Sequence, residues 1–476
     1  MRRNYFKILA ISALVLVPCF WHRRIAAGDL ASHMYNAWLA QLIERGQVTG
    51  LWLDSRWNNV LFDLLASGLG KFFSLQVTEK IAASLCVLIF FWGMFALVAT
   101  ASERAPWFLV PLFAMIAYGY TFHMGFFNYY LSLGLSFFGI AIFWRGKKWE
   151  RLIPLALAPL ILLAHPLGLA WMAGAIAYIA IAQAIQARHQ PWLLLAAGMT
   201  LVLIHFDFWR HYEIMAQSKG FYFFNGADQL LLFGPRYDIP RIALICFPLV
   251  ALGVDIYGRI HEGDDWRKYF IPAQLYVVLL LAAGLLPDAI RFRPGNSALI
   301  ALLTERLTSV SAVVFCCVLG VMRPRWWHLL GFTAIAGVFF ALVYQDTKIV
   351  NNMEQQAERL ERTLPRNSRV LATIQPLAGS RILVQHIADR ACIGYCFSYG
   401  NYEPSSEFRV RAVPGNPYVM SDYDLVVDME DGTYEVQSED LPAYQLYECS
   451  SDGTELCIRP LEAGEENDRL GIHRDD

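Results

Sequence analysis

Long apolar runs joined by short charged loops fill the first 345 residues of the 476-residue chain, and this pattern limits the fold more than any single motif. Hydrophobic residues make up 56% of the sequence, and the mean hydropathy is +0.37. Soluble domains seldom exceed half apolar residues at a positive mean hydropathy, so the apolar surplus needs lipid. We therefore expect an α-helical multi-span membrane domain over 1–345.

Residues 346–476 differ in composition, because they are polar and contain no lysine after Lys348. They predict a small soluble α+β domain with a polar helix at 349–363. Its acidic end, Glu462 to Asp476, has the composition of a disordered tail. Strands are predicted at 369–374, 381–387, 424–429 and 444–449.

The first apolar run, which ends at Trp21, is predicted to be an uncleaved span with a cytoplasmic N-terminus. His22-Arg23-Arg24 stands where a signal peptidase needs small residues. Ten further spans are predicted at 78–100, 106–122, 127–144, 152–165, 168–187, 192–206, 241–257, 270–287, 309–322 and 328–345. Several are shorter than the roughly 20 residues of a perpendicular span, so only their approximate positions are predicted.

With about eleven spans, the basic loops lie on the cytoplasmic side, as the positive-inside rule requires. The C-terminal domain and three large loops, 22–77, 207–240 and 288–308, then lie outside the cytoplasm. These features are typical of a protein of the inner (cytoplasmic) membrane of a bacterium.

Four of the nine cysteines occur in the polar C-terminal region. Cys449 and Cys457 flank a turn centred on Gly453, and Cys392 and Cys396 are close enough in sequence to pair across a turn. Cys392 and Cys396 as half of a zinc site is the alternative interpretation. Two disulfides would place this region in an oxidising compartment, in agreement with the predicted topology.

The first large loop begins with Gly28-Asp29-Leu30-Ala31-Ser32-His33. Asp29 and His33 are four residues apart, so on a helix they share one face. A carboxylate at the membrane boundary can take the proton of an acceptor hydroxyl or amine where a lipid-linked sugar presents its head group. The alternative is that Asp29 caps a helix that begins near Leu30, with His33 exposed.

Asp29 with the following His33-Met-Tyr-Asn-Ala-Trp resembles the first-loop motif of the GT-C superfamily. These integral-membrane glycosyltransferases use polyprenyl-phosphate sugars, and they include bacterial relatives of the protein O-mannosyltransferases and the aminoarabinose and lipopolysaccharide-core transferases. The resemblance implies that Asp29 is the essential Asp of the first extracytoplasmic loop and that 58–73 supplies an interfacial helix. It also implies a soluble domain after the last span.

The likeness covers residues 28–41 one by one and otherwise the layout of the chain. Leu30 stands where many relatives have a second acidic residue, and the loop contains no Asp-x-Asp pair. We therefore expect no cofactor and no metal site. If a divalent metal is used, Asp29, His33 and Asp54 are its candidate ligands.

The leaving lipid phosphate needs cations. The loop before the tenth span offers Arg291 and Arg293, and Glu305-Arg306 follows at the membrane edge. This Glu-Arg pair resembles a feature of several GT-C members in which Arg meets lipid phosphate, and guanidinium suits phosphate through its bidentate fork. The alternative for these arginines is local pairing or contact with lipid head groups.

Other polar residues have plain structural interpretations. His165 precedes a Pro-Leu-Gly turn as a capping residue, while His123 and Asn128 lie in an aromatic turn that could border a site under the first loop. His386 and Asp389 resemble a catalytic pair, but we favour a structural role for them. The C-terminal domain is then expected to cover the site or contact the acceptor.

The sequence thus predicts a cell-envelope glycosyltransferase with a polyprenyl-phosphate sugar donor and an extracytoplasmic acceptor, which is a glycan, a lipid or a protein. Asp29 and His33 are the predicted catalytic residues. Arg291, Arg293, Arg306 and Glu305 are the predicted donor-phosphate residues. Membrane lipids are expected partners and nucleic acid is not. A transporter or flippase is the main alternative, but its spans usually carry ionisable residues, which are scarce here. A polysaccharide polymerase and a non-enzymatic scaffold are further alternatives.

Overall fold

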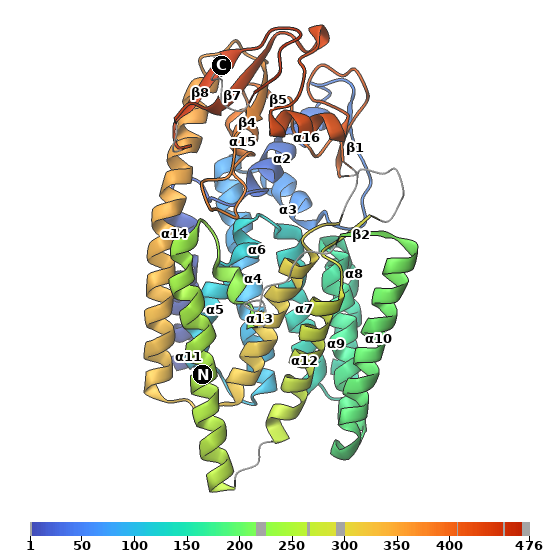
Figure 1. The fold of residues 1–476 in the computed structure, drawn as a ribbon, viewed down its shortest axis with the longest axis vertical. Helices are drawn as coiled ribbons and strands as arrows, with labels where there is room; N and C mark the ends of the chain where they lie inside the picture. The colour runs from blue at the N-terminus through green and yellow to red at the C-terminus, as the bar shows by residue number, and fades with distance from the viewer. Residues whose placement is uncertain are drawn as a thin grey trace, which may run out of the picture.

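The computed structural model describes residues 2–215, 225–263, 267–291, 300–406, 408–450 and 453–468. Figure 1 shows a bundle of long, roughly parallel helices with a smaller, strand-containing region on one end. We call the end that carries this region the upper end and the opposite end the lower end.

Eight helices within the described residues are long and apolar enough to cross a membrane. They are α4 (Leu75–Ala101), α7 (Phe127–Arg145), α9 (Pro166–Ala184), α10 (Gln190–His211), α11 (Asp238–Glu262), α12 (Phe270–Leu285), α13 (Leu303–Val321) and α14 (Trp326–Glu361). Further apolar helices occupy the other predicted positions: α1 (Arg2–Phe20), α5 (Val110–Ala117) with α6 (Tyr120–His123), and α8 (Ile153–Ala164). A membrane-type helical domain is therefore confirmed, while the count of eleven spans stays a prediction.

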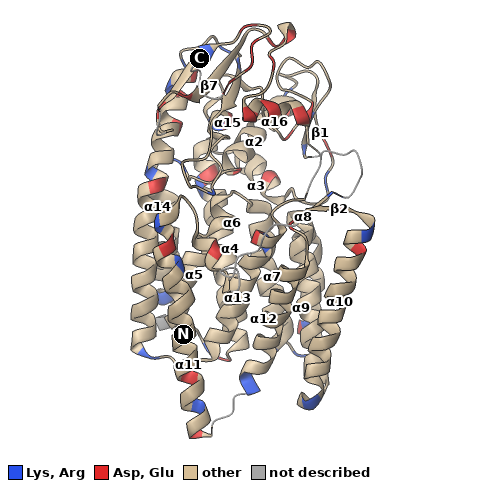
Figure 2. Cartoon of the chain, viewed as in Figure 1, with Lys and Arg blue, Asp and Glu red and all other residues tan. Residues whose placement is uncertain are grey.

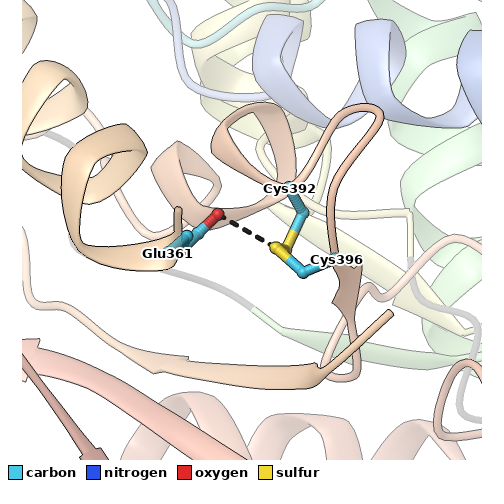
Figure 3. Close-up of side chains that lie close together, drawn as sticks. All are labelled: Glu361, Cys392 and Cys396. Carbon is cyan, nitrogen blue, oxygen red and sulfur yellow. Dashed lines mark hydrogen bonds between the residues drawn. A yellow bond between two sulfur atoms is a disulfide. The ribbon is translucent and has the colours of Figure 1, made fainter. Parts of the chain in front are cut away.

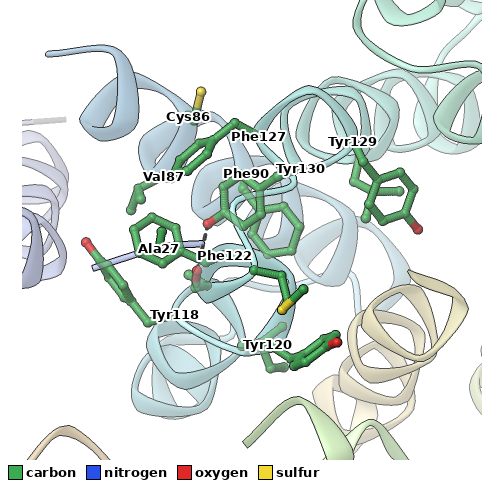
Figure 4. Close-up of a cluster of buried hydrophobic side chains, with 14 of the residues drawn as sticks. Ala27, Cys86, Val87, Phe90, Tyr118, Tyr120, Phe122, Phe127, Tyr129 and Tyr130 are labelled. Carbon is green, nitrogen blue, oxygen red and sulfur yellow. Dashed lines mark hydrogen bonds between the residues drawn. The ribbon is translucent and has the colours of Figure 1, made fainter. Parts of the chain in front are cut away.

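Buried aromatic side chains of the bundle form a cluster that includes Phe90, Phe122 and Tyr130 (Figure 4). The rings of Phe90 and Tyr130 stack with centroids 4.1 Å apart. The Tyr130 hydroxyl donates to the carbonyl of Ala117, so this ring is buried with its polar tip satisfied. α4 and α7 approach closely here, because a Cβ on Gly93 would lie only 2.4 Å from the carbonyl oxygen of Gly134. This core supports the segments above it.

Between α1 and α4 the chain forms α2 (Leu30–Glu44), the short strand β1 (Leu51–Leu53) and α3 (Leu61–Leu69). The predicted interfacial helix at 58–73 corresponds to α3, which is shorter than predicted. β1 pairs antiparallel with β6 (Val410–Ala412), so the first loop and the C-terminal region share a two-stranded sheet.

The C-terminal region contains a four-stranded sheet in the order β5-β4-β7-β8. β4 (Arg369–Thr373) is parallel to β5 (Phe397–Ser398) and to β7 (Ala443–Glu448), and β8 (Leu456–Pro460) is antiparallel to β7. The strands predicted at 369–374 and 444–449 are confirmed. The hairpin turn around Gly453 is closed by the predicted Cys449–Cys457 disulfide, and Cys392–Cys396 is the second.

Two predicted strands are wrong. Residues 381–386 form a loop that packs on the membrane domain, and Ile387 begins a short helix. In this loop the backbone N–H of Arg381 donates to the carbonyl of Leu232 at 2.7 Å. Residues 424–429 lie in the helix α16 (Tyr423–Asp431), whose first turn is capped by the Asp422 carboxylate.

The predicted polar helix at 349–363 corresponds to the last part of α14, a single helix of 36 residues that leaves the bundle and enters the C-terminal region. The predicted boundary between 345 and 346 therefore lies inside a continuous helix. Basic residues gather at the lower end of the bundle, for example at the foot of α10 and beside α12 (Figure 2). This is the distribution that the predicted orientation requires.

Candidate functional site

Asp29 is held in place at the upper end by backbone contacts. The N–H groups of Gly28 and Asp29 donate to the carbonyls of His123 and Met124, at 2.8 and 3.0 Å. Gly125 completes this turn with a φ of +84°, and a Cβ there would lie 2.5 Å from the backbone nitrogen of Asp29. Only glycine satisfies both the positive φ and the close approach.

Asp29 occupies the N-cap position of α2, but its side chain makes no capping hydrogen bond. The alternative prediction, in which Asp29 serves as the capping side chain, is therefore wrong. The side chain is 20% exposed, and none of the described residues donates a hydrogen bond to its carboxylate. Its oxygens remain available to a ligand.

His386, at the start of α15 (Ile387–Ala391), lies against Asp29. Its Nε2 is 3.8 Å from Oδ1 of Asp29, and its Nδ1 is 3.1 Å from Oδ2 of Asp389. The Ser398 hydroxyl donates to the other oxygen of Asp389. A chain of contacts thus runs from Ser398 on β5 to the carboxylate in the first loop. The sequence suggested a structural role for His386 and Asp389 and did not reveal that His386 lies next to Asp29.

The charges at this pair are set by burial and by neighbours. Burial raises the pKa of Asp29, and the positive charges of His386, His33 and Arg306 only partly offset that effect. Burial opposes the charged form of His386, but the hydrogen bond and charge of Asp389 raise its pKa to about 9. At neutral pH His386 is therefore an imidazolium, and it lies beside a carboxyl group whose pKa is raised.

His33 forms a second carboxylate–imidazole pair one turn along α2. Its Nδ1 is 2.6 Å from Oδ1 of Asp63 on α3, and the Asn128 amide donates to the other oxygen of Asp63 at 2.8 Å. Burial alone would lower the pKa of His33, yet the Asp63 carboxylate raises it to about 9. His33 is therefore paired rather than exposed, and Asn128 does border the first loop.

Of the predicted phosphate ligands, Arg306 has the surroundings that best fit this role. Its guanidinium stacks on the ring of Phe126, with 4.6 Å to the centroid, and Nη1 lies 3.4 Å from Nε2 of His165. Among the described residues no carboxylate lies within 4.0 Å of it, and its buried Nε has no hydrogen-bond partner. Its charge acts on Asp29, as noted above. His165 also accepts a hydrogen bond from the N–H of Leu167, as expected of a cap.

Glu305 serves a different partner from the one predicted. Its carboxylate is 3.3 Å from the guanidinium of Arg381, which stacks on the ring of Tyr120 at 4.4 Å. Arg381 also donates to the carbonyl of Asp228 at 3.3 Å. Glu305 thus fastens the loop before His386 to the membrane domain.

Arg291 lies on β3 (Ala289–Arg291) and forms an ion pair of 2.9 Å with Glu213 on β2 (Glu213–Met215). Arg291 therefore pairs with a carboxylate on the adjacent strand. Arg293, the other predicted phosphate ligand, lies outside the described residues.

Two acidic residues of the C-terminal region complete the surroundings and were not singled out from the sequence. Glu403 lies close enough to Asp63 and His33 to interact with both, and burial raises its pKa to about 8. Burial raises the pKa of Glu430, which interacts with His386, to about 7. The ring of Tyr402 lies 5.1 Å from that of His386. These groups come from distant segments, and no local motif marks them.

Among the described residues, one group of His, Cys, Asp and Glu side chains lies close enough together to hold a metal ion: Glu361, Cys392 and Cys396 (Figure 3). Its two sulfur atoms are joined in a disulfide, so neither is a thiolate ligand. Asp54 pairs with Arg411 and Arg56, away from Asp29 and His33.

No family model, curated protein or solved structure matches this chain. The resemblance to the GT-C superfamily therefore rests on residues 28–41 and on the order of the elements. The evidence for a function therefore comes from the geometry around Asp29.

Proposed function

We propose that this protein is a membrane glycosyltransferase that moves a sugar from a polyprenyl-phosphate-linked donor to an acceptor outside the cytoplasm. The observation that supports it best is the Asp29 carboxylate, which lies at the upper end of an apolar bundle with free oxygens, beside His386 and in the field of Arg306. A general base needs an unoccupied oxygen and a raised pKa, and a lipid-linked donor needs cations at the membrane boundary.

In the proposed reaction, an acceptor hydroxyl attacks the anomeric carbon of the donor sugar. The bond from that carbon to the phosphate oxygen breaks, and its electron pair leaves with the polyprenyl phosphate. Asp29 takes the hydroxyl proton as the new glycosidic bond forms. One carboxylate suffices for this direct displacement, so the anomeric configuration is inverted.

The two cations near Asp29 have a role on the leaving group. The Arg306 guanidinium lies over the rings of Phe126 and Tyr129 and next to His165, and its Nε has no hydrogen-bond partner among the described residues. A planar fork of donors suits phosphate oxygens. His386, with a pKa of about 9, adds a second positive charge that stabilises the phosphate as it departs. His33 is a positioning residue, because its pairing with Asp63 fixes α2 to α3.

The proposed function also implies an orientation of the protein in the membrane. The upper end faces out of the cytoplasm of a bacterial inner membrane, and the basic lower end and the N-terminus face in. The disulfides of the C-terminal region agree with such an oxidising surrounding.

The test uses the purified protein in lipid nanodiscs with a panel of polyprenyl-phosphate sugars, and it measures sugar release and transfer. Asp29→Asn keeps the side-chain shape and removes the base, so we expect turnover to fall at least about 100-fold while lipid binding persists. Asp54→Asn is the matched control, because Asp54 is an acidic residue of the same loop that is paired with Arg411. Full activity of Asp29→Asn would overturn the proposal.

A further inference from the structure

A groove of about 380 Å³ opens on the C-terminal region, away from Asp29. Its lining combines rings, prolines, amides and two guanidinium groups. The lining residues are Gln47, Pro365, Arg366, Asn367, Ser368, Arg369, Phe397, Pro417, Tyr418, Pro442 and Tyr444. Neither the fold nor the proposed chemistry at Asp29 uses this groove.

The position of the groove follows from the sheet topology. β4, β5 and β7 are parallel, so their first residues lie along one edge of the sheet, and the groove is at that edge. The opposite end of β4 leads into the loop that reaches the membrane domain through Arg381. The groove therefore lies on the side of the sheet remote from the bundle.

The groove is connected to the proposed site by α2. Asp29 precedes the first residue of α2, and Gln47, a lining residue, follows its end. The 15 residues of this helix span roughly 22 Å. A ligand that contacts both the groove and Asp29 must therefore be a chain of several units.

The charge of the groove is uncompensated. None of its lining residues is Asp or Glu. Arg369 donates to the carbonyls of Pro417 and Glu439, at 2.8 and 2.7 Å, and these contacts fix the side chain without neutralising it. Arg366 is exposed and lies over the ring of Tyr395, 5.3 Å from its centroid. Among the described residues neither guanidinium has a carboxylate within 4.0 Å. An anionic ligand is the complement.

The rings of the groove supply flat apolar surfaces between these charges. Phe397 and Tyr418 lie 4.6 Å apart, and Tyr418 and Tyr444 are only half-buried. Rings that carry a hydroxyl offer an apolar face and a polar tip, which matches the alternating faces and hydroxyls of a sugar. Guanidinium binds a carboxylate through two parallel hydrogen bonds.

We propose that this groove binds an acidic polysaccharide and holds the acceptor chain several sugars away from the reacting hydroxyl. The identification of that chain as the acceptor rests on the proposed function. The binding itself follows from the groove alone. The proposal narrows the acceptor class from glycan, lipid or protein to a uronate-bearing glycan.

The experiment measures binding of fluorescent hexagalacturonate to the full-length protein in nanodiscs, without any lipid-linked donor. Neutral maltohexaose and hexaglutamate serve as comparison probes for sugar without charge and charge without sugar. We expect hexagalacturonate to bind more tightly than both, and its affinity to fall as salt is raised. Arg366→Gln should weaken it about tenfold, the loss expected for one charge-assisted hydrogen bond.

Arg359→Gln is the matched control, because Arg359 is exposed on α14 and does not line the groove. Tyr418→Ala is the second variant and tests the ring surface, with thermal unfolding as the check on folding. Equal binding of hexaglutamate or maltohexaose, or unchanged affinity of Arg366→Gln, overturns the proposal. If the oligosaccharide binds but no donor releases its sugar, the result supports polysaccharide binding in the groove and contradicts the proposed glycosyltransferase function. If sugar release depends on Asp29 but the oligosaccharide does not bind, only the proposed role of the groove is contradicted.

Discussion

Each end of the helical bundle has an aspartate among basic residues, and the two aspartates differ in the hydrogen bonds that they accept. At the lower end, Oδ2 of Asp255 accepts from Arg259 and from the Tyr269 hydroxyl, both at 2.8 Å, and Oδ1 accepts from the N–H of Arg323 at 3.0 Å. At the upper end, Asp29 has cations nearby but accepts no hydrogen bond from the described residues. One aspartate is saturated and the other is open.

This contrast separates a structural charge from a reactive one. A carboxylate whose oxygens already accept hydrogen bonds stabilises its surroundings and is a poor base. A buried carboxylate with free oxygens costs folding free energy, and a protein retains it where a ligand uses it. The contrast therefore predicts opposite effects of the same substitution at the two ends.

The largest effect on stability is expected from Asp255→Asn. The variant leaves the Arg259 charge without its carboxylate, and breaking a buried ion pair costs about 3 kcal/mol or more. Thermal unfolding in detergent should show a clear loss for Asp255→Asn and none for Asp29→Asn. A larger loss of stability for Asp29→Asn than for Asp255→Asn would show that the number of hydrogen bonds accepted by each carboxylate does not distinguish the two sites.

The next effect concerns His386 and is visible in the pH profile of sugar transfer. Wild-type activity should fall on the acid side as Asp29 becomes protonated at its raised pKa. It should fall again as pH rises through about 9, because His386 loses its charge there. His386→Gln should lower the rate about tenfold at neutral pH, with kcat affected more than KM.

In that variant the decline near pH 9 should disappear, because Gln does not titrate. His189→Gln, an exposed histidine on the other side of the bundle, is the control and should keep the wild-type profile. A decline near pH 9 that survives in His386→Gln would assign it to another group, with His33 as the first candidate because its pKa is also about 9.

The smallest effect is expected from Gly125→Ala, which moves Asp29 without changing it. The added Cβ meets the Asp29 backbone at 2.5 Å and also strains a residue with a φ of +84°. Gly464→Ala imposes nearly the same φ, +83°, with no atom within 4 Å of the added Cβ. Both should lose about 1 kcal/mol or more of stability from backbone strain, and only Gly125→Ala should also lose activity. Equal activities would mean that the turn does not position the carboxylate.

The sequence was sufficient where short-range chemistry decides the structure. Apolar runs predicted the membrane helices, and the spacing around Gly453 predicted the Cys449–Cys457 disulfide. The catalytic role of Asp29 stays a prediction. The geometry of Arg306 fits its predicted role, although a phosphate contact stays a prediction. Each of these features is encoded within about one helix length of sequence.

The sequence was insufficient where a tertiary contact decides. Ile382, Leu383 and Val384 look like a buried strand, but they are apolar because their loop packs against the bundle. The β-branched run of α16 hid a helix whose signals are the Asp422 cap and Gly432 at +75°. The sequence around His386 shows the nearby Asp389 but not the contact with Asp29, because Asp29 is distant in the chain.

The pairing of Asp29 with His386 has a consequence for biosynthesis. Asp29 and His386 are far apart in the chain, so a ribosome has to make the whole segment between them before they can meet. A nascent chain with all its spans inserted would still lack its imidazolium. If the proposed function is right, activity begins only after the C-terminal region has folded onto the first loop.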